Sequence, residues 1–256
     1  MTDLKGKAAW VTGAGSGVGE AAALALAQAG VAVTLTGRSR APLQSVADRI
    51  ASAGGRALVA PADVTDPDAA DRIVADTVRE FGRLDILVNN AGSNVTERSW
   101  SKINPERIES VLDANLTSAF YCARAALAAM RPRKDGLLIH TASWAGRWPG
   151  LLSGPAYVAA KHGVVAMSHT INMEEFMHGI RSTVLCPAEI ATPILDRRPV
   201  PVSAEDRARM LQPSDMAELI LYVARLPASV CMNEVVISPT WNRGYAHAAG
   251  IGAKTS

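Results

Sequence analysis

The chain has 256 residues, a hydrophobic content of 48% and a formal net charge of +2. A net charge this small argues against nucleic acid or an acidic membrane surface as a partner. No apolar run reaches the roughly 18 residues of a membrane-spanning helix, and the charged N-terminal segment lacks an apolar signal core. Cys122, Cys186 and Cys231 are odd in number and scattered, which indicates a reducing cytoplasm.

Short segments that are apolar at nearly every position alternate with longer segments of helical periodicity. Residues 19–30 and 68–82 are helical segments of this kind, and each ends on a glycine suited to a helix C-terminus. The alternation predicts right-handed crossovers and a parallel sheet with helices on both faces. The expected strands are residues 8–13, 31–37, 56–63, 84–90, 136–143, 180–187 and 233–238.

One segment, residues 189–212, interrupts this alternation and is rich in proline. A loop of this length inside a compact fold usually has a function, so we expect a lid or a binding segment. The sequence contains no linker, and we therefore expect one domain over residues 1–240. The remaining residues, 241–256, are rich in glycine and alanine and are predicted to be a C-terminal tail.

The stretch TGAGSGVGE, residues 12–20, follows the first expected strand and leads into an alanine-rich helix. Gly13, Gly17 and Gly19 permit positive φ angles and a close approach of the backbone to a phosphate. The N-terminus of the following helix offers free N–H groups to the same phosphate. Because a strand precedes the loop and a helix follows it, the loop predicts a dinucleotide site rather than only a tight turn.

The next strand ends in TGRSR, without the acidic residue that NAD-binding units commonly have at this place. Arg38, with Arg40 close by, suits a phosphate because its planar fork presents several donors. The sequence therefore favours NADP(H), with NAD(H) as the alternative. A solvated surface arginine is the alternative interpretation of Arg38.

The stretch SGPAYVAAKHGV places Tyr157 and Lys161 four residues apart, on one face of a helix. Their small neighbours would allow another group to approach this face closely. Taken alone, the pair is typical of an exposed helix on which a lysine extends its stem beside a tyrosine. The rest of the sequence decides between this interpretation and a functional role for the pair.

Several fragments together resemble the short-chain dehydrogenase/reductase family. TGAGSGVG resembles its TGxxxGxG loop, NNAG at residues 89–92 resembles its fourth-strand motif, and four residues stand where the family has its catalytic group. These four are Asn115, Ser143, Tyr157 and Lys161. The resemblance extends over roughly residues 5–240. It implies a Rossmann-type, doubly wound α/β sheet of about seven strands in a three-layer α/β/α domain, and an oxidoreductase that uses a pyridine nucleotide.

The resemblance also implies which residues contact the cofactor. Asp63 and Val64 would flank the adenine, while Ile190 and Thr192 would contact the nicotinamide side. The whole implied set is Gly13, Gly15, Ser16, Gly17, Val18, Gly19, Arg38, Asp63, Val64, Asn90, Ala91, Gly92, Tyr157, Lys161, Pro187, Ile190 and Thr192.

The four catalytic candidates have residue types suited to proton transfer. A tyrosine has an ordinary pKa near 10, and a neighbouring cation such as Lys161 favours the phenolate. Tyr157 would then act as general acid and base, and Ser143 would hydrogen-bond the substrate oxygen. Asn115 would hold a water of the proton relay, as in the family. The alternatives are a serine that caps a turn and an asparagine amide satisfied by the backbone at a helix bend.

The substrate side is predicted from loops expected at the carboxyl edge of the sheet, where ligands bind in such folds. Their apolar character predicts a substrate with a hydrophobic or aromatic part, or alternatively a subunit interface. Glu189 would select a cationic or hydroxyl-bearing substrate, or else cap the next turn. The candidates are Trp144, Trp148, Leu151, Glu189 and Ile194.

Three features depart from the family pattern. Ala188 replaces a glycine and must avoid the φ angles that only glycine tolerates. Ser16 replaces a second basic residue found in many NADP-preferring members. The last strand, NEVVISPTW, resembles that of a subgroup of NADP-dependent members that act on 3-hydroxy acids and related small alcohols.

We therefore expect a cytoplasmic, NADP(H)-dependent oxidoreductase that interconverts a ketone or 3-oxo compound and a secondary alcohol, assembled as a homo-oligomer (tetramer or dimer). The first alternative is an NAD(H)-dependent alcohol or 3-hydroxy acid dehydrogenase of the same family. The second is a non-catalytic dinucleotide sensor on the same fold. No metal site is expected, because none of the five histidines forms HxxxH or HExxH.

Overall fold

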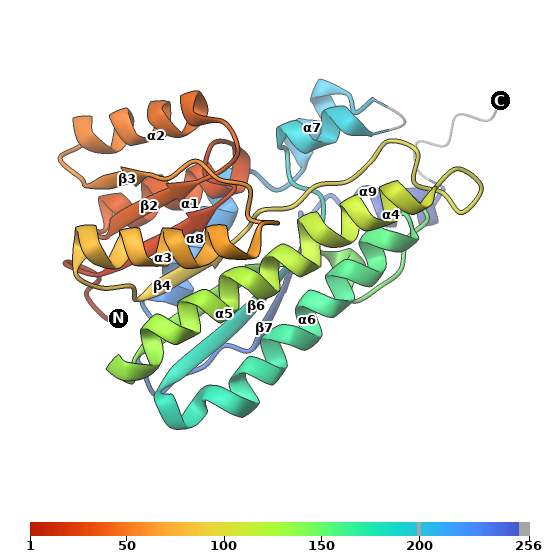
Figure 1. Ribbon diagram of the computed structural model, residues 1–256. Coiled ribbons are helices and arrows are strands. Elements are labelled where there is room, and N and C mark those ends of the chain that lie inside the picture. Colours follow the sequence, from red (N-terminus) through yellow and green to blue (C-terminus); the bar gives the residue numbers. More distant parts are fainter. Residues whose placement is uncertain (199–200, 251–256) are drawn as a thin grey trace.

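Seven parallel strands form one sheet in the order β3-β2-β1-β4-β5-β6-β7 (Figure 1). The computed structural model describes residues 1–198 and 201–250. Each strand lies within a segment predicted to be one, so the α/β fold class is confirmed. The strands are β1 (Ala8–Thr12), β2 (Ala32–Thr36), β3 (Ala57–Val59), β4 (Ile86–Asn89), β5 (Gly136–Thr141), β6 (Ile180–Pro187) and β7 (Glu234–Ile237).

Helices cover both faces of the sheet, because successive residues of a buried strand point to opposite sides. Ala9 and Val11 of β1 share one core with α1, α2 and α8, and Trp10 shares the other with α3, α5 and α6. The helices are α1 (Gly17–Gln28), α2 (Arg40–Ser52), α3 (Pro67–Phe81), α4 (Pro105–Leu112), α5 (Ser118–Met130), α6 (Pro155–Glu175), α7 (Ala204–Arg209), α8 (Pro213–Ala224) and α9 (Arg243–Ala248).

Helix ends follow the expected glycine chemistry. Gly82 ends α3 with φ +76, and Gly30 follows α1 with φ +84. Both angles lie in the left-handed region that glycine enters without steric cost. None of the described helices combines the length and the apolar character needed to cross a bilayer.

The sheet order reverses direction at β1, which lies between β2 and β4. In open α/β sheets, the crevice beyond the carboxyl ends of the strands at such a point is where ligands bind. The loops after β1 and β4 therefore meet at one place, since Val11 pairs with Val88 in the parallel register. This topology brings the glycine loop beside the NNAG motif.

The predicted lid, described over residues 189–198 and 201–212, is a structured excursion. At its base Leu211 N donates to Glu189 O at 3.2 Å, and Ala191 N donates to Leu211 O at 2.8 Å. Leu195, Val202 and Met210 form its own small apolar core. The excursion holds the 3₁₀ turn Pro193–Arg197 and helix α7, so it is a compact loop with its own packing.

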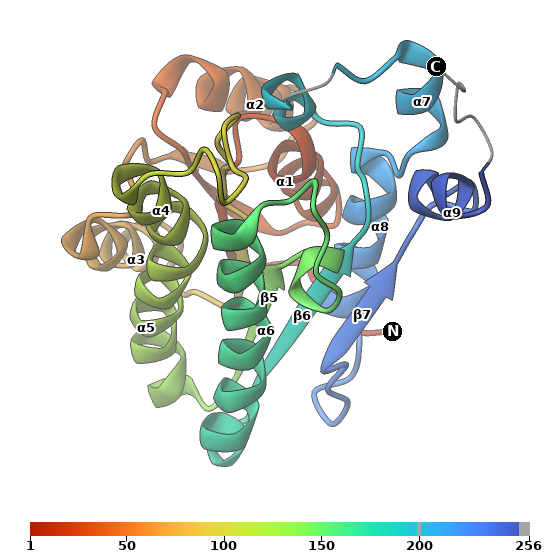
Figure 2. The same cartoon turned by 90° about the vertical axis from the view of Figure 1, so that its right-hand side faces the viewer.

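The segment predicted to be a tail, residues 241–256, differs from that expectation in its first part. Residues 243–248 form α9, which stands beside α7 near the end of β7 (Figure 2). Asn242 is buried, and Arg243 binds Asp206 of the lid at 3.1 Å. These are tertiary contacts between distant segments, so no local pattern in a glycine- and alanine-rich stretch predicts them. Residues 251–256 lie outside the described residues.

Candidate active site

The glycine loop leaves room for a ligand because side chains are sterically excluded from it. A Cβ atom on Gly19 would lie 2.2 Å from the carbonyl oxygen of Gly13, closer than any real contact. Gly13 and Gly17 have φ angles of +65 and +57, which favour glycine. Ser16, the N-cap of α1, makes no side-chain cap hydrogen bond within the described chain, so the first N–H groups of α1 stay available to a phosphate. The loop therefore fits the pyrophosphate of a dinucleotide.

Thr12 joins the glycine loop to the NNAG motif. Its hydroxyl oxygen accepts hydrogen bonds from the backbone N–H groups of Asn90 and Ala91, each at 2.9 Å. The side chain of Asn90 donates to the Thr12 carbonyl at 3.3 Å and lies against Gly13 and Gly19. The predicted residues of both motifs thus form one continuous wall.

Lys161 is a buried cation of the site. It is 4% exposed, and its Nζ donates to the backbone oxygen of Thr141 at 2.9 Å. Burial lowers the pKa of Lys161 to about 8. A Cβ atom on Gly92 would lie only 2.7 Å from Asn115 Oδ1 and 3.5 Å from this Nζ, so the lack of a side chain at Gly92 leaves room for Asn115 beside the ammonium.

Tyr157 lies one helical turn before Lys161, and the Lys161 Nζ is 5.5 Å from the centre of its ring. Burial raises the pKa of Tyr157, while the polar side chain of Ser143 and the charges of Arg198 and Arg98 oppose this rise. Among the described residues, Lys161 does not contribute to the shift in the Tyr157 pKa. The lowering of this pKa by Lys161 therefore stays a prediction. A raised pKa keeps the hydroxyl protonated.

The sequence left two roles open for Ser143, a turn cap and a hydrogen-bond donor to the substrate oxygen, and its position allows both. Its Oγ accepts a hydrogen bond from Ala145 N at 3.1 Å, which caps the 3₁₀ turn Trp144–Gly146. The same side chain acts on the Tyr157 hydroxyl and lowers its pKa. The cap fixes the hydroxyl beside the tyrosine, where both oxygens can face one substrate oxygen.

Asn115 lies in a π-helical turn, Asp113–Thr117, between α4 and α5. Its Nδ2 donates to Ser93 O at 2.6 Å and to Val111 O at 2.8 Å, and its Oδ1 accepts from Ser93 N at 3.3 Å. Both amide protons are thus used by the backbone, as in the alternative of a satisfied amide at a helix bend. The amide ties the helix to the loop after β4, which leaves the proposed relay water without a side-chain donor from Asn115.

Thr192, at the start of the predicted lid, lies against the glycine loop, because its Cγ2 would be 3.1 Å from a Cβ atom on Gly17. Ile190 pairs with Leu211 at the base of the lid, and Pro187 ends β6. Ala188 donates its N–H to Ile237 O at 2.8 Å. Among the described non-glycine residues only Lys134 has a positive φ, so Ala188 keeps an ordinary backbone angle, as predicted.

The expected adenine end is more open. Arg38 is exposed just after β2. Asp63, after β3, accepts hydrogen bonds from the N–H and hydroxyl of Thr65 at 3.0 and 2.8 Å. Val64 packs against the core that holds Trp10, Val18 is buried in α1, and Gly15 lies against Pro42.

The predicted substrate residues divide into two groups. Trp144 contacts the ring of Trp148 at 5.5 Å and the ring of Tyr245 from α9 at 5.7 Å, which forms an aromatic wall next to Ser143. Leu151 is fully exposed at 102% and Ile194 is 40% exposed, so neither packs into this wall.

Glu189 is matched by cations of the protein itself. Its carboxylate contacts Arg198 through one oxygen and Arg243 Nε at 3.0 Å through the other. Because both oxygens are engaged, this carboxylate is poorly suited to select a cationic substrate. Arg98, Arg198 and Tyr245 are site residues that sequence analysis missed: Arg98 carries no motif, Arg198 lies in the irregular lid, and Tyr245 lies in the segment read as a tail.

His140 of β5 is a further buried polar residue near the ammonium. Burial, reinforced by the charge of Lys161, lowers the pKa of His140 to about 3, so the ring stays neutral. Lys161 is therefore not joined by a second positive charge from this histidine. No sequence pattern distinguished His140 from other strand residues.

Comparisons with known proteins identify the family. Residues 7–200 match the model of the family described as short chain dehydrogenase. An uncharacterized oxidoreductase of Staphylococcus aureus (strain USA300) is 34% identical over 242 residues, which span 93% of this chain and 100% of the relative.

Two solved structures extend the similarity to three dimensions. A short-chain type dehydrogenase/reductase from Mycobacterium marinum has a TM-score of 0.84 at 32% identity, over 95% of this chain and 96% of the other. An alcohol dehydrogenase from Thermococcus sibiricus, complexed with 5-hydroxy-NADP, has a TM-score of 0.83 at 25% identity, over 93% and 98%. The chain therefore belongs to the short chain dehydrogenase family of oxidoreductases.

Proposed function

We propose that this protein is an NADP(H)-dependent oxidoreductase that interconverts a ketone or 3-oxo compound and a secondary alcohol. The observation that carries the proposal is the grouping of three side chains: Ser143 acts on the Tyr157 hydroxyl, and the Lys161 ammonium lies 5.5 Å from the centre of the tyrosine ring. This group lies at the edge of the sheet where the glycine loop fits a dinucleotide. The Thermococcus sibiricus alcohol dehydrogenase, complexed with 5-hydroxy-NADP, supports the reaction type and the cofactor class.

In this proposal the bound cofactor supplies or accepts the hydride, and the side chains handle the proton. Ser143 and Tyr157 both hydrogen-bond the substrate oxygen and polarise the carbonyl. Because burial raises its pKa, Tyr157 is protonated at neutral pH and can give its proton to that oxygen during reduction. Lys161 stabilises the phenolate that results, since an adjacent cation favours the ionised form.

Replacing Tyr157 with Phe removes the donated proton and leaves the shape of the site. We expect ketone reduction, followed by the loss of NADPH absorbance, to fall about a hundred- to ten-thousandfold, with NADPH affinity unchanged. Tyr222→Phe is the matched control, because Tyr222 is 46% exposed on α8. Turnover by Tyr157→Phe at the parental rate would remove Tyr157 from the mechanism.

The pH dependence of ketone reduction should reflect the ionisation of Lys161. Burial lowers the pKa of Lys161 to about 8, whereas that of Tyr157 is raised from 10.0. The ammonium is charged below its pKa, so its stabilisation of the phenolate is present at pH 7 and is lost as the pH rises through about 8. We expect kcat/KM for the ketone to decline above that pH, and Lys161→Met to lack this decline. A profile of the parent that stays flat to pH 10 would contradict the assignment.

Cofactor preference is proposed to depend on Arg38, with NAD(H) as the alternative cofactor. A guanidinium at this exposed position can bind the 2′-phosphate of NADP. We expect the parent to bind NADP⁺ more tightly than NAD⁺, and Arg38→Asp to lose about ten- to a hundredfold in NADP⁺ affinity by calorimetry. Arg56→Asp, which changes a 64% exposed side chain before β3, controls for net charge. Equal affinities in the parent would show that Arg38 does not select the cofactor.

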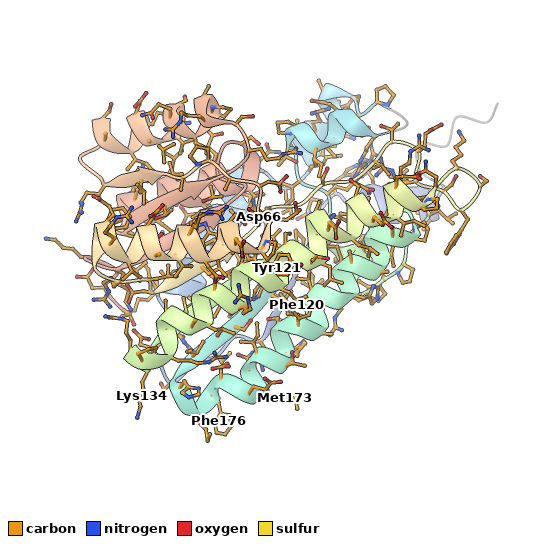
Figure 3. All side chains as sticks on the ribbon, viewed as in Figure 1. Asp66, Phe120, Tyr121, Lys134, Met173 and Phe176 are labelled. Carbon is orange, nitrogen blue, oxygen red and sulfur yellow. The ribbon has the colours of Figure 1, made fainter. Side chains whose placement is uncertain are left out.

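We further propose that the chain forms a homo-oligomer through an apolar surface on α5, α6 and the 3₁₀ turn Phe176–His178 that follows α6. Phe120, Met173 and Phe176 point outward there and are 50%, 74% and 68% exposed (Figure 3). Burying such side chains between copies is favourable because it removes apolar area from water. Light scattering should give a dimer or tetramer mass for the parent and for Val78→Asp on α3, and a lower mass for Phe120→Asp. A monomeric parent would refute this assembly.

A further inference from the structure

Two arginines from distant loops contribute positive charge to the surroundings of Tyr157. Arg98 belongs to the loop after β4, and Arg198 to the lid after β6. The charge of each acts on the Tyr157 hydroxyl, and the charge of Arg198 also acts on Arg98. Neither belongs to the glycine loop or to the four catalytic candidates.

Arg98 packs directly on the beginning of α6. A Cβ atom on Gly154 would lie 2.6 Å from the Arg98 carbonyl oxygen and 2.8 and 2.9 Å from its Cβ and Cγ. Gly154 is the N-cap of α6 and precedes Tyr157 by three residues. The missing side chain at Gly154 therefore lets the stem of Arg98 lie against the helix, with its Nε buried near the start of the turn that carries the tyrosine.

Arg198 is oriented by a chain of ion pairs. Its Nη1 contacts Glu189, whose other oxygen contacts Arg243 Nε at 3.0 Å, and Arg243 Nη1 contacts Asp206 at 3.1 Å. The side chains of Arg198 and Glu189 are only 18% and 23% exposed. A guanidinium held in this way is preorganised, so a ligand would not have to order it on binding.

The two guanidinium groups repel each other, and burial adds to the cost. Burial lowers the pKa of Arg98, and the charge of Arg198 lowers it further. An anion that binds both arginines would relieve this repulsion, and the planar forks suit a carboxylate. The aromatic wall of Trp144, Trp148 and Tyr245 lies next to Ser143 and offers an apolar surface to the rest of the same molecule.

We propose that Arg98 and Arg198 bind a carboxylate of the substrate, so that the carbonyl compound is an oxo acid whose apolar or aryl body lies on the aromatic wall. This proposal rests on the proposed function and narrows its substrate class. Glu189 and Arg243 are then positioning residues, because they act through Arg198.

The test compares aryl oxo acids that have two to four carbons between ketone and carboxylate with their methyl esters. The proteins are the parent, Arg98→Met, Arg198→Met, Arg198→Lys and a control, Arg124→Met, whose side chain is 60% exposed on α5. We expect the parent to prefer at least one acid over its ester. Each Met variant should raise KM for that acid about ten- to a hundredfold, with smaller effects on the ester, on kcat and on the Kd for NADP⁺. Arg198→Lys should be intermediate, because it keeps the charge without the fork.

Binding of the same acids to protein saturated with NADP⁺, measured by calorimetry, provides a readout without turnover. If neither acids nor esters are reduced, the proposed function fails, whereas acid binding that both Met variants lose would still support the subsite. Three results would overturn it: no binding of any oxo acid by the parent, equal use of acid and ester, or weakened NADP⁺ binding in the Met variants. The last result would assign the arginines to a cofactor phosphate.

Discussion

A buried ammonium costs on the order of several kcal/mol unless its protons find acceptors, and Lys161 satisfies one of them with the backbone oxygen of Thr141. Thr141 ends β5, and Lys161 lies in α6. The bond therefore fixes the helix that carries Tyr157 against the strand that leads to Ser143. His140, one residue before Thr141, is kept neutral by burial and by the same charge. The geometry of the whole site depends on this one anchored cation.

Much of this arrangement follows from local patterns in the sequence. Runs that are apolar at nearly every position predicted all the strands, although the edge strands β3 and β7 are only partly buried. The glycine loop was predictable since a Cβ atom at Gly19 would collide with the Gly13 carbonyl, so no other residue serves there. Tyr157 and Lys161 share a helix, and their spacing alone determined that they lie on one face.

The remaining parts depend on contacts between segments far apart in sequence. The helix α9 lies in a stretch that has no strong periodicity, and it joins the site through the pairing of Arg243 with Glu189 and the contact of Tyr245 with Trp144. The sequence also could not predict which residues surround Arg198, because these neighbours come from the lid and from the C-terminal helix. The hydrogen bond of the Asn115 amide with the loop after β4 was equally unpredictable, because that loop is distant in sequence.

The π-helical turn at Asp113–Thr117 makes the length of this region as important as its composition. Ser118 N donates to Asp113 O, five residues earlier, so the turn holds one residue more than an α-helical turn. An α-helix advances about 100° per residue. Deleting a single residue here would restore regular α-helical bonding and rotate α4 relative to α5 by about that angle. The contact of the Asn115 side chain with the loop after β4 therefore fixes the number of residues between the two helices.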